Sequence, residues 1–232
     1  MILPQRSFCS RGSIESMYLR DRVIVLKKDP YREHDRRYVM YGIEYGLLSA
    51  VARGASLPKS KKAGHLEPFS ETEVMIAKGA AFDKLAVARR VGAIHELPLP
   101  SLTILGAFSH LLLRLLRPGI ADERIFELLK ELIESVSALP SEPSADRSRF
   151  LLATATLKFL DILGFGPSIE TEDSQLATVL KFMRGAAFAD VLRMTASREI
   201  LQNASAFVEE ALTEAPLDIE PHGVRTIQSY VG

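Results

Sequence analysis

The 232-residue chain contains one cysteine and no tryptophan. A single thiol, Cys9, cannot form an internal disulfide or a zinc site built from cysteines, which excludes a disulfide-stapled secreted fold and a zinc finger. Long hydrophobic runs are also missing, because the longest stretch without Asp, Glu, Lys or Arg, residues 97–113, contains two prolines and a histidine. A membrane-spanning helix needs about 20 predominantly apolar residues, so we expect no membrane insertion.

Residues 1–16 lack the apolar segment of a secretory signal, and we therefore expect a cytoplasmic protein. They also lack a sustained hydrophobic period. We expect them to form a flexible N-terminal extension, or to lie upstream of the effective start.

Net charge is a third absence, since 29 Lys and Arg balance 29 Asp and Glu. Taken as a whole, this balance argues against a polyanion as partner. It is a cancellation, however: residues 1–100 contain 17 basic and 11 acidic side chains, and the remainder contains 12 and 18. Such asymmetry indicates a nucleic-acid or membrane partner, although ordinary solvated faces whose signs segregate account for the composition equally well.

Motifs for catalysis and cofactor binding are absent from the sequence. It contains no GxxxxGK[ST], HExxH or GxSxG pattern, and its five histidines are far apart. Glu71 and Glu73 fall on one face of an expected strand, but an exposed polar face explains them better than a hydrolytic carboxylate pair. We therefore expect no catalytic residue, no cofactor and no metal.

From Tyr18 to about Val91 the hydrophobic period is mostly two, as in half-buried strands. Leu19, Val23 and Val25 share one face of a first strand. Four more strands are expected over residues 38–41, 47–52, 73–78 and 85–89, with Gly46 supplying the positive φ of a tight turn. Five short strands of this spacing predict a small OB-type barrel over residues 17–92.

Beyond Pro98 and Pro100 the period becomes helical. Expected helices end at Pro118-Gly119 and Gly164, and the expected N-terminal caps are Asp122, Ser144 or Asp146, Ser174 and Ser197. Residues 93–232 are thus predicted to form a compact helical domain. The fold class is α+β: an N-terminal five-stranded OB-type β-barrel followed by an all-α helical domain.

Basic and aromatic side chains gather in the predicted barrel. Such barrels bind single strands by tracking phosphates with cations and stacking bases on aromatic rings. The candidate DNA-binding residues are Lys27, Lys28, Arg32, Arg36, Arg37, Arg53, Lys59, Lys61, Lys62, Tyr31 and Tyr38. For the tyrosines a core position is the stronger interpretation, because alternation requires Tyr38 and Tyr41 to point in opposite directions. For the cations we favour phosphate contacts over a purely solubilising role.

Three consecutive segments resemble the N-terminal signature of the bacterial DNA repair protein RecO family. They are VIVLKKDPYREHD (residues 23–35), IEYGLLSAVARG (43–54) and PKSKKAGHLEPF (58–69). A fourth, FLDILGFGP (159–167), is similar to a segment of the family's helical domain. The resemblance implies an OB-fold followed by a helical domain, which agrees with the division drawn from periodicity.

The resemblance also implies a function in DNA repair and homologous recombination. Family members bind single- and double-stranded DNA, anneal complementary strands, and with RecR help load RecA onto DNA coated by single-stranded-DNA-binding protein. It implies a nucleoid-associated location within the cytoplasm. The alternative from a different class is a protein-interaction scaffold whose DNA contact is incidental.

One departure from the family concerns metal. Many relatives follow the Gly-Phe-x-Pro segment with four cysteines that hold zinc, whereas no cysteine follows residue 167 here. We therefore expect no zinc, and expect apolar packing of Leu176, Val179, Leu180 and Met183 to hold residues 168–188 instead. An acidic, apolar-ended tail of single-stranded-DNA-binding protein needs an apolar groove with a cation at its rim, for which Arg114, Arg117 and Lys158 are candidates.

Overall fold

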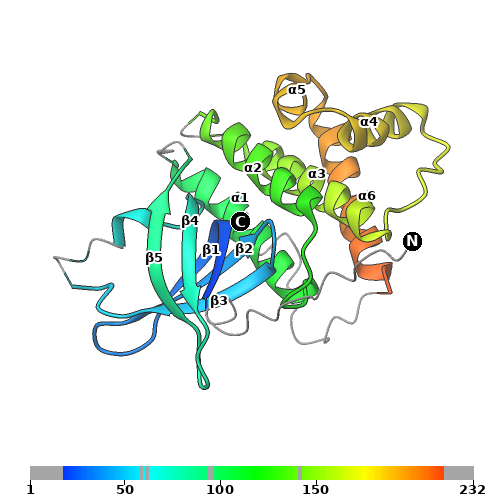
Figure 1. Ribbon diagram of the computed structural model, residues 1–232. Coiled ribbons are helices and arrows are strands. Elements are labelled where there is room, and N and C mark those ends of the chain that lie inside the picture. The colour runs from blue at the N-terminus through cyan, green and yellow to red at the C-terminus, as the bar shows by residue number, and fades with distance from the viewer. Residues whose placement is uncertain (1–17, 58–59, 61–62, 93–96, 141–142, 217–232) are drawn as a thin grey trace, which may run out of the picture.

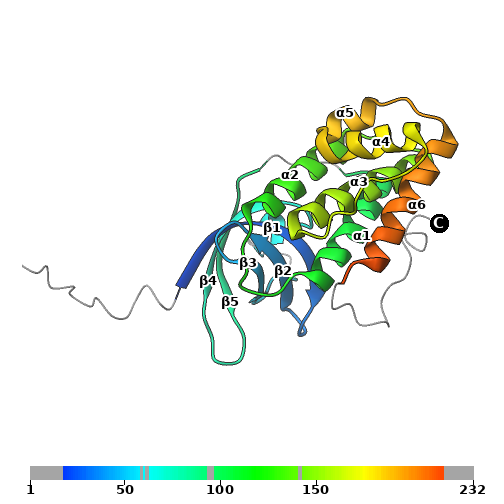
Figure 2. The same cartoon turned by 90° about the vertical axis from the view of Figure 1, so that its right-hand side faces the viewer.

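In the part of the chain that the structure describes, five strands precede six α-helices (Figure 1). The computed structural model describes residues 18–57, 60, 63–92, 97–140 and 143–216. The strands form one unit and the helices pack together beside it, with α2 and α1 nearest to the strands (Figures 1 and 2). The predicted fold class, a five-stranded barrel followed by a helical domain, is confirmed.

The strands close into a barrel in the order β1-β2-β3-β5-β4. Their bounds are β1 Tyr18–Pro30, β2 Arg36–Gly42, β3 Gly46–Ala52, β4 Glu71–Ala77 and β5 Lys84–Arg90. Neighbours are antiparallel except β3 and β5, which meet in parallel at Val51 and Lys84. A short 3-10 helix, η2 (Ala63–His65), lies in the connector between β3 and β4.

Alternation along the strands decides which side chains fill the barrel. Leu19, Val23 and Val25 of β1 lie in the barrel core with Tyr38 and Met40 of β2. Tyr41 belongs instead to the core shared with the helices, so the two tyrosines point in opposite directions, as predicted. Both are fully buried.

The helical unit is built around α3, which packs against α6, α1 and α2. The bounds are α1 Leu99–Leu115, α2 Glu123–Ser137, α3 Ala145–Leu163, α4 Ser174–Gly185, α5 Phe188–Arg193 and α6 Arg198–Glu214. The buried residues of α3 include Phe150, Leu157 and Phe159, and the ring of Phe159 meets Phe108 of α1 edge to face at 5.9 Å between centroids. These contacts form the core of the helical unit.

Local capping explains where the helices begin. Asp122 accepts from the backbone N–H of Arg124 at 2.9 Å, and Ser144 and Ser197 cap α3 and α6 in the same way. The predicted cap at Ser174 is wrong by one residue, because the Asp173 carboxylate accepts from two backbone N–H groups, at 2.9 and 3.1 Å. A carboxylate also interacts favourably with the helix dipole there.

The barrel is joined to the helices through Tyr41. Its hydroxyl accepts from the backbone N–H of Asp122 at 2.9 Å and donates to the Asp122 carbonyl, with 3.1 Å between the oxygens. Ile24, Leu26 and Phe69 of the barrel unit lie in the same hydrophobic cluster as α1 and α2. The joint therefore combines apolar burial with one hydroxyl that satisfies both backbone groups at the start of α2.

The turn between β2 and β3 lies against the same joint. Gly46 has a φ of 63°, and a Cβ there would lie 2.0 Å from the carbonyl oxygen of Ile120, so only glycine fits. The buried carboxylate of Asp21 accepts from the backbone N–H groups of Arg22, Glu44 and Tyr45. Burial raises the pKa of the Asp21 carboxyl in spite of these bonds. This end of the barrel is therefore closed by the turn and covered by the helices.

None of the helices in the part of the chain that the structure describes is long and apolar enough to cross a bilayer.

The joint gives a first prediction. Tyr41→Phe removes the hydroxyl and leaves the Asp122 N–H without its acceptor, while the Asp122 carbonyl keeps its bond from the backbone N–H of Ile125 at 3.0 Å. We expect this change to lower the free energy of unfolding by about 1–3 kcal/mol. Urea denaturation followed by circular dichroism measures this decrease. Tyr45→Phe, at a side chain that is 42% exposed, is the matched control and should change nothing. Equal stability of the two variants would show that the hydroxyl does not hold the joint.

Candidate nucleic-acid interface

The end of the barrel away from the helices is formed by two chain reversals. One is the loop between β1 and β2, residues 31–35, and the other is the hairpin between β4 and β5, residues 78–83 (Figure 1). Tyr31 of the first and Phe82 of the second meet edge to face, with 5.6 Å between ring centroids. We call this the open end of the barrel.

Hydrogen bonds to backbone groups hold both reversals against the end of β3 and the residues that follow it. The Asp35 carboxylate accepts from the backbone N–H of Gly54 at 2.9 Å, and the N–H of Ser56 donates to the carbonyl of His34 at 3.1 Å. The N–H of Val51 donates to the carbonyl of Asp83 at 2.9 Å. The open end is therefore a fixed arrangement of three chain segments.

Cations surround the two rings. The guanidinium of Arg37 lies 4.9 Å from the centroid of Tyr31, and that of Arg32 lies 5.4 Å from Tyr31 and 5.8 Å from Phe82. The ammonium of Lys84 lies 6.0 Å from Phe82. These are cation–π distances. We call Tyr31, Arg32, Arg37, Phe82 and Lys84 the aromatic–cation cluster.

The predicted cations differ in what already binds them. Lys27 pairs with Asp29 at 3.0 Å, and Lys28 pairs with Glu67 at 3.1 Å. No carboxylate of the described residues pairs with the predicted cations Arg32, Arg36, Arg37 and Arg53, and none pairs with Lys84, which was not predicted. The cations of the cluster are held by aromatic faces alone, and contacts of that kind at exposed sites contribute only about 0.5–1 kcal/mol.

One predicted aromatic contact is wrong. Tyr38 is 0% exposed and lies in the barrel core, where no base can stack on it. Its position follows from the strand period, because Tyr38 shares a face with Met40. Tyr31 is the one of the two predicted aromatics that reaches the surface of the open end.

Three predicted cations, Lys59, Lys61 and Lys62, lie outside the described residues. Two residues of the open end were missed, Phe82 and Lys84. They follow a Gly79-Ala-Ala segment that carries no charge, and only the parallel contact between β5 and β3 places them beside Tyr31. An aromatic residue next to a turn was the one signal in the sequence that pointed to them.

The carboxylate pair considered for hydrolysis is neutralised by neighbouring arginines. Glu71 binds Arg22, and Glu73 binds Arg89 at 2.5 Å. Within the described ranges, no group of three or more His, Cys, Asp or Glu side chains is arranged to hold a metal ion. Glu71 and Glu73 therefore serve as ion-pair partners on the outer face of β4.

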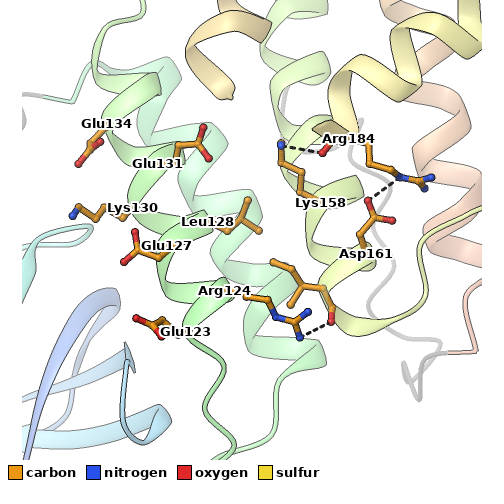
Figure 3. Close-up of a pocket in the computed structure, with 11 residues that line it drawn as sticks. Glu123, Arg124, Glu127, Leu128, Lys130, Glu131, Glu134, Lys158, Asp161 and Arg184 are labelled. Atoms are coloured by element: carbon orange, nitrogen blue, oxygen red, sulfur yellow. Dashed lines mark hydrogen bonds and ion pairs between the residues drawn. The ribbon is translucent and has the colours of Figure 1, made fainter. Parts of the chain in front are cut away.

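A groove of about 830 Å³ lies in the helical unit between α2 and α3 (Figure 3). Four glutamates of α2 line it, Glu123, Glu127, Glu131 and Glu134, and Lys158, Asp161 and Arg184 lie across from them. The Lys158 ammonium donates to the carbonyl of Arg184 at 3.2 Å, and burial lowers its pKa. Arg114 and Arg117 do not line this groove, so it does not unite the three cations predicted to bind a partner.

A second groove, of about 580 Å³, lies between the end of α2, the start of α3 and the segment before α6. Its lining is mostly apolar and includes Leu139, Pro143, Leu192 and Met194. Arg147 is the guanidinium that lines it, with Nη1 donating to the carbonyl of Met194 at 2.9 Å. An apolar groove with a cation was expected in this unit, but at other residues.

Comparison with known proteins agrees with this geometry. The family model described as recombination protein O N terminal matches residues 17–93, and the model described as recombination protein O C terminal matches residues 99–172. The chain belongs to the RecO family. The first match ends shortly after β5 and the second begins at α1, so the two family models correspond to the barrel and the helices.

Curated RecO relatives share about a third of their residues with the chain in the aligned part. "DNA repair protein RecO" of Desulforudis audaxviator is 30% identical over 155 residues, which cover 63% of this chain and 57% of that protein. The protein of the same name from Desulforamulus reducens is 31% identical over 121 residues, 51% of this chain and 47% of the relative. That of Anaeromyxobacter sp. strain K is 32% identical over 130 residues, 54% and 51%. The chain thus aligns with about half the length of these relatives.

The residues after α3 do not fit the four-cysteine zinc site that the family resemblance implies. The segment after α3 contains no cysteine, and apolar packing takes its place. Val179, Leu180 and Met183 of α4 are buried in the core of the helical unit, with Leu176 packed against it. Arg184 ties α4 to α3 through Asp161, with 2.9 Å between Nε and the carboxylate, and donates to the carbonyl of Pro167.

These contacts predict that the folded chain is independent of zinc. We expect substoichiometric zinc in the purified protein and an unchanged melting temperature after treatment with EDTA, because no cysteine follows residue 167 and apolar side chains of α4 fill the core there. Elemental analysis and thermal denaturation measure the two quantities. Stoichiometric zinc, or a melting temperature that falls with EDTA, contradicts the prediction.

Proposed function

We propose that this RecO family member acts in DNA repair and homologous recombination by binding single- and double-stranded DNA at the open end of its barrel. We further propose that the protein anneals complementary strands and, with RecR, helps load RecA onto DNA coated by single-stranded-DNA-binding protein. It acts without catalysis and without a cofactor. The aromatic–cation cluster carries this proposal, because it presents three exposed cations beside two half-buried rings at the surface.

The cations of the cluster can bind a phosphate without first breaking an ion pair. Arg32, Arg37 and Lys84 pair with no carboxylate of the described residues, and each contacts only the face of a ring. To bind a phosphate they need only move away from that ring. Lys27 and Lys28, in contrast, must break their ion pairs with Asp29 and Glu67 before they bind a phosphate. We therefore expect Arg32, Arg37 and Lys84 to contribute more affinity for DNA than Lys27 and Lys28 do.

Annealing follows from the same charges. Two complementary strands repel each other through their phosphates, and bound cations lower this repulsion by releasing counterions. A surface that contacts phosphates leaves the hydrogen-bonding edges of the bases free to pair. No step of this process requires nucleotide hydrolysis or a metal.

The helical unit supplies the protein contacts in this proposal. The groove around Arg147 combines an apolar lining with a guanidinium, the chemistry that suits the acidic, apolar-ended tail of single-stranded-DNA-binding protein. The groove between α2 and α3 has a more highly charged lining, in which five carboxylates face Arg124, Lys130, Lys158 and Arg184, and it offers an apolar tail end less contact. The competing proposal, a scaffold with incidental DNA contact, assigns the grooves the same role and the open end none.

A salt titration of single-stranded DNA binding tests the DNA proposal. We expect the double variant Arg32→Ala/Arg37→Ala to bind roughly tenfold more weakly, and the slope of log K against log salt to become shallower by about 0.7 for each phosphate that the variant no longer neutralises. Fluorescence anisotropy of a labelled oligonucleotide measures both quantities. The control Lys27→Ala removes one cation of the same barrel that is already paired, and we expect a much smaller change.

Equal affinities and slopes for the double variant, the control and the wild type would support the scaffold instead. The connector is tested separately by changing Lys59, Lys61 and Lys62 to Ala. If affinity and salt slope do not change in that variant, the predicted phosphate contacts of these lysines are wrong, while the role of the cluster still stands.

A further inference from the structure

The two rings of the cluster are held in place before any ligand arrives. The hairpin that carries Phe82 is fixed by Asp83, whose carboxylate binds the Lys78 ammonium at 2.7 Å and the backbone N–H of Gly79 at 3.3 Å. The reversal is tight, since a Cβ on Gly79 would lie 2.2 Å from the carbonyl oxygen of Phe82. On the other side, the backbone N–H of Tyr31 donates to the carbonyl of Asp35 at 3.2 Å.

Aromatic rings that are already in position distinguish single-stranded from duplex DNA, because they stack only on unpaired bases. In a duplex each base is stacked between its neighbours, so its face is not accessible to a protein ring. An unpaired base offers its face, and stacking on an aromatic side chain contributes about 1–3 kcal/mol for each base. Phosphates, in contrast, are present on single strands and duplexes alike.

We infer that Tyr31 and Phe82 form a stacking platform for an unpaired base, and that this platform makes the open end prefer single-stranded DNA to duplex DNA. The inference rests on the proposed DNA binding and adds to it the determinant of strand preference. The cations supply affinity for both forms, whereas the rings act only where a base is free.

The positions of the cations couple stacking to phosphate binding. Arg32 lies within cation–π distance of both rings, and Arg37 lies over Tyr31. A base that stacks on a ring displaces the guanidinium from its face, and the phosphates that flank this base are the nearest anions to receive it. Stacking and phosphate contact therefore strengthen each other on a single strand.

The test compares three ligands of one length: a single-stranded oligonucleotide, the same strand with abasic sites throughout, and the duplex. The abasic strand keeps its phosphates and loses its bases. We expect the wild type to bind the intact strand about 5- to 150-fold more tightly than the abasic strand, the factor that stacking of one base supplies. Anisotropy at a fixed salt concentration measures all three affinities.

Phe82→Leu keeps an apolar side chain in the hairpin and removes the ring. We expect it to lose affinity for the intact strand, and to bind the abasic strand and the duplex as the wild type does. Phe82→Tyr restores a ring and should restore the preference. Thermal denaturation shows whether each variant is folded, and the comparison of intact with abasic strand by the wild type needs no variant at all.

Two results overturn the inference. One is equal binding of intact and abasic strands by the wild type, and the other is a decrease in affinity of Phe82→Leu that is the same for all three ligands. In both cases DNA is still bound, so the proposed function stands and only the platform fails. If the wild type binds none of the three ligands, the proposed function itself is wrong.

Discussion

The contact between Tyr41 and the backbone of Asp122 determines which part of the barrel is left for a ligand. It attaches β2 to the start of α2 with distances of 2.9 and 3.1 Å, beside the turn that Gly46 and Asp21 form. The helices therefore cover the end of the barrel that contains this turn. The reversals between β1 and β2 and between β4 and β5, which carry Tyr31 and Phe82, lie away from that turn (Figure 2).

The distribution of charge also favours the open end of the barrel as the surface for a polyanion. The chain has no net charge, and within the barrel several cations are neutralised by neighbouring carboxylates: Arg22 by Glu71, Lys28 by Glu67 and Arg89 by Glu73. Exposed pairs of this kind contribute little stability, but they remove positive charge from the outer faces. Three barrel cations that pair with no carboxylate of the described residues, Arg32, Arg37 and Lys84, lie around the two rings, and Arg36 and Arg53 are two more outside this cluster. A neutral protein can thus present a local surface suited to a polyanion.

Sequence alone predicted the barrel, the helical unit and most of the caps, because these depend on period and on neighbours in the chain. It also predicted Tyr31 and the arginines of the open end, since they follow one another in a single segment. It missed Phe82 and Lys84, which reach the cluster through the pairing of β5 with β3, a contact between distant segments. It named Tyr38 as a candidate DNA contact although strand alternation favoured the core position that the structure shows. It did not find the Arg147 groove, whose lining comes from three separate segments.

Annealing of two complementary oligonucleotides tests the central claim, that the open end of the barrel brings DNA strands together. The measurement uses labelled strands without nucleotide or Mg²⁺ and compares the wild type with Arg32→Ala/Arg37→Ala. We expect the wild type to accelerate annealing and the double variant, folded to the same degree, to lose most of that acceleration. Annealing by the variant at the rate of the wild type, or no acceleration by either protein, would contradict the account.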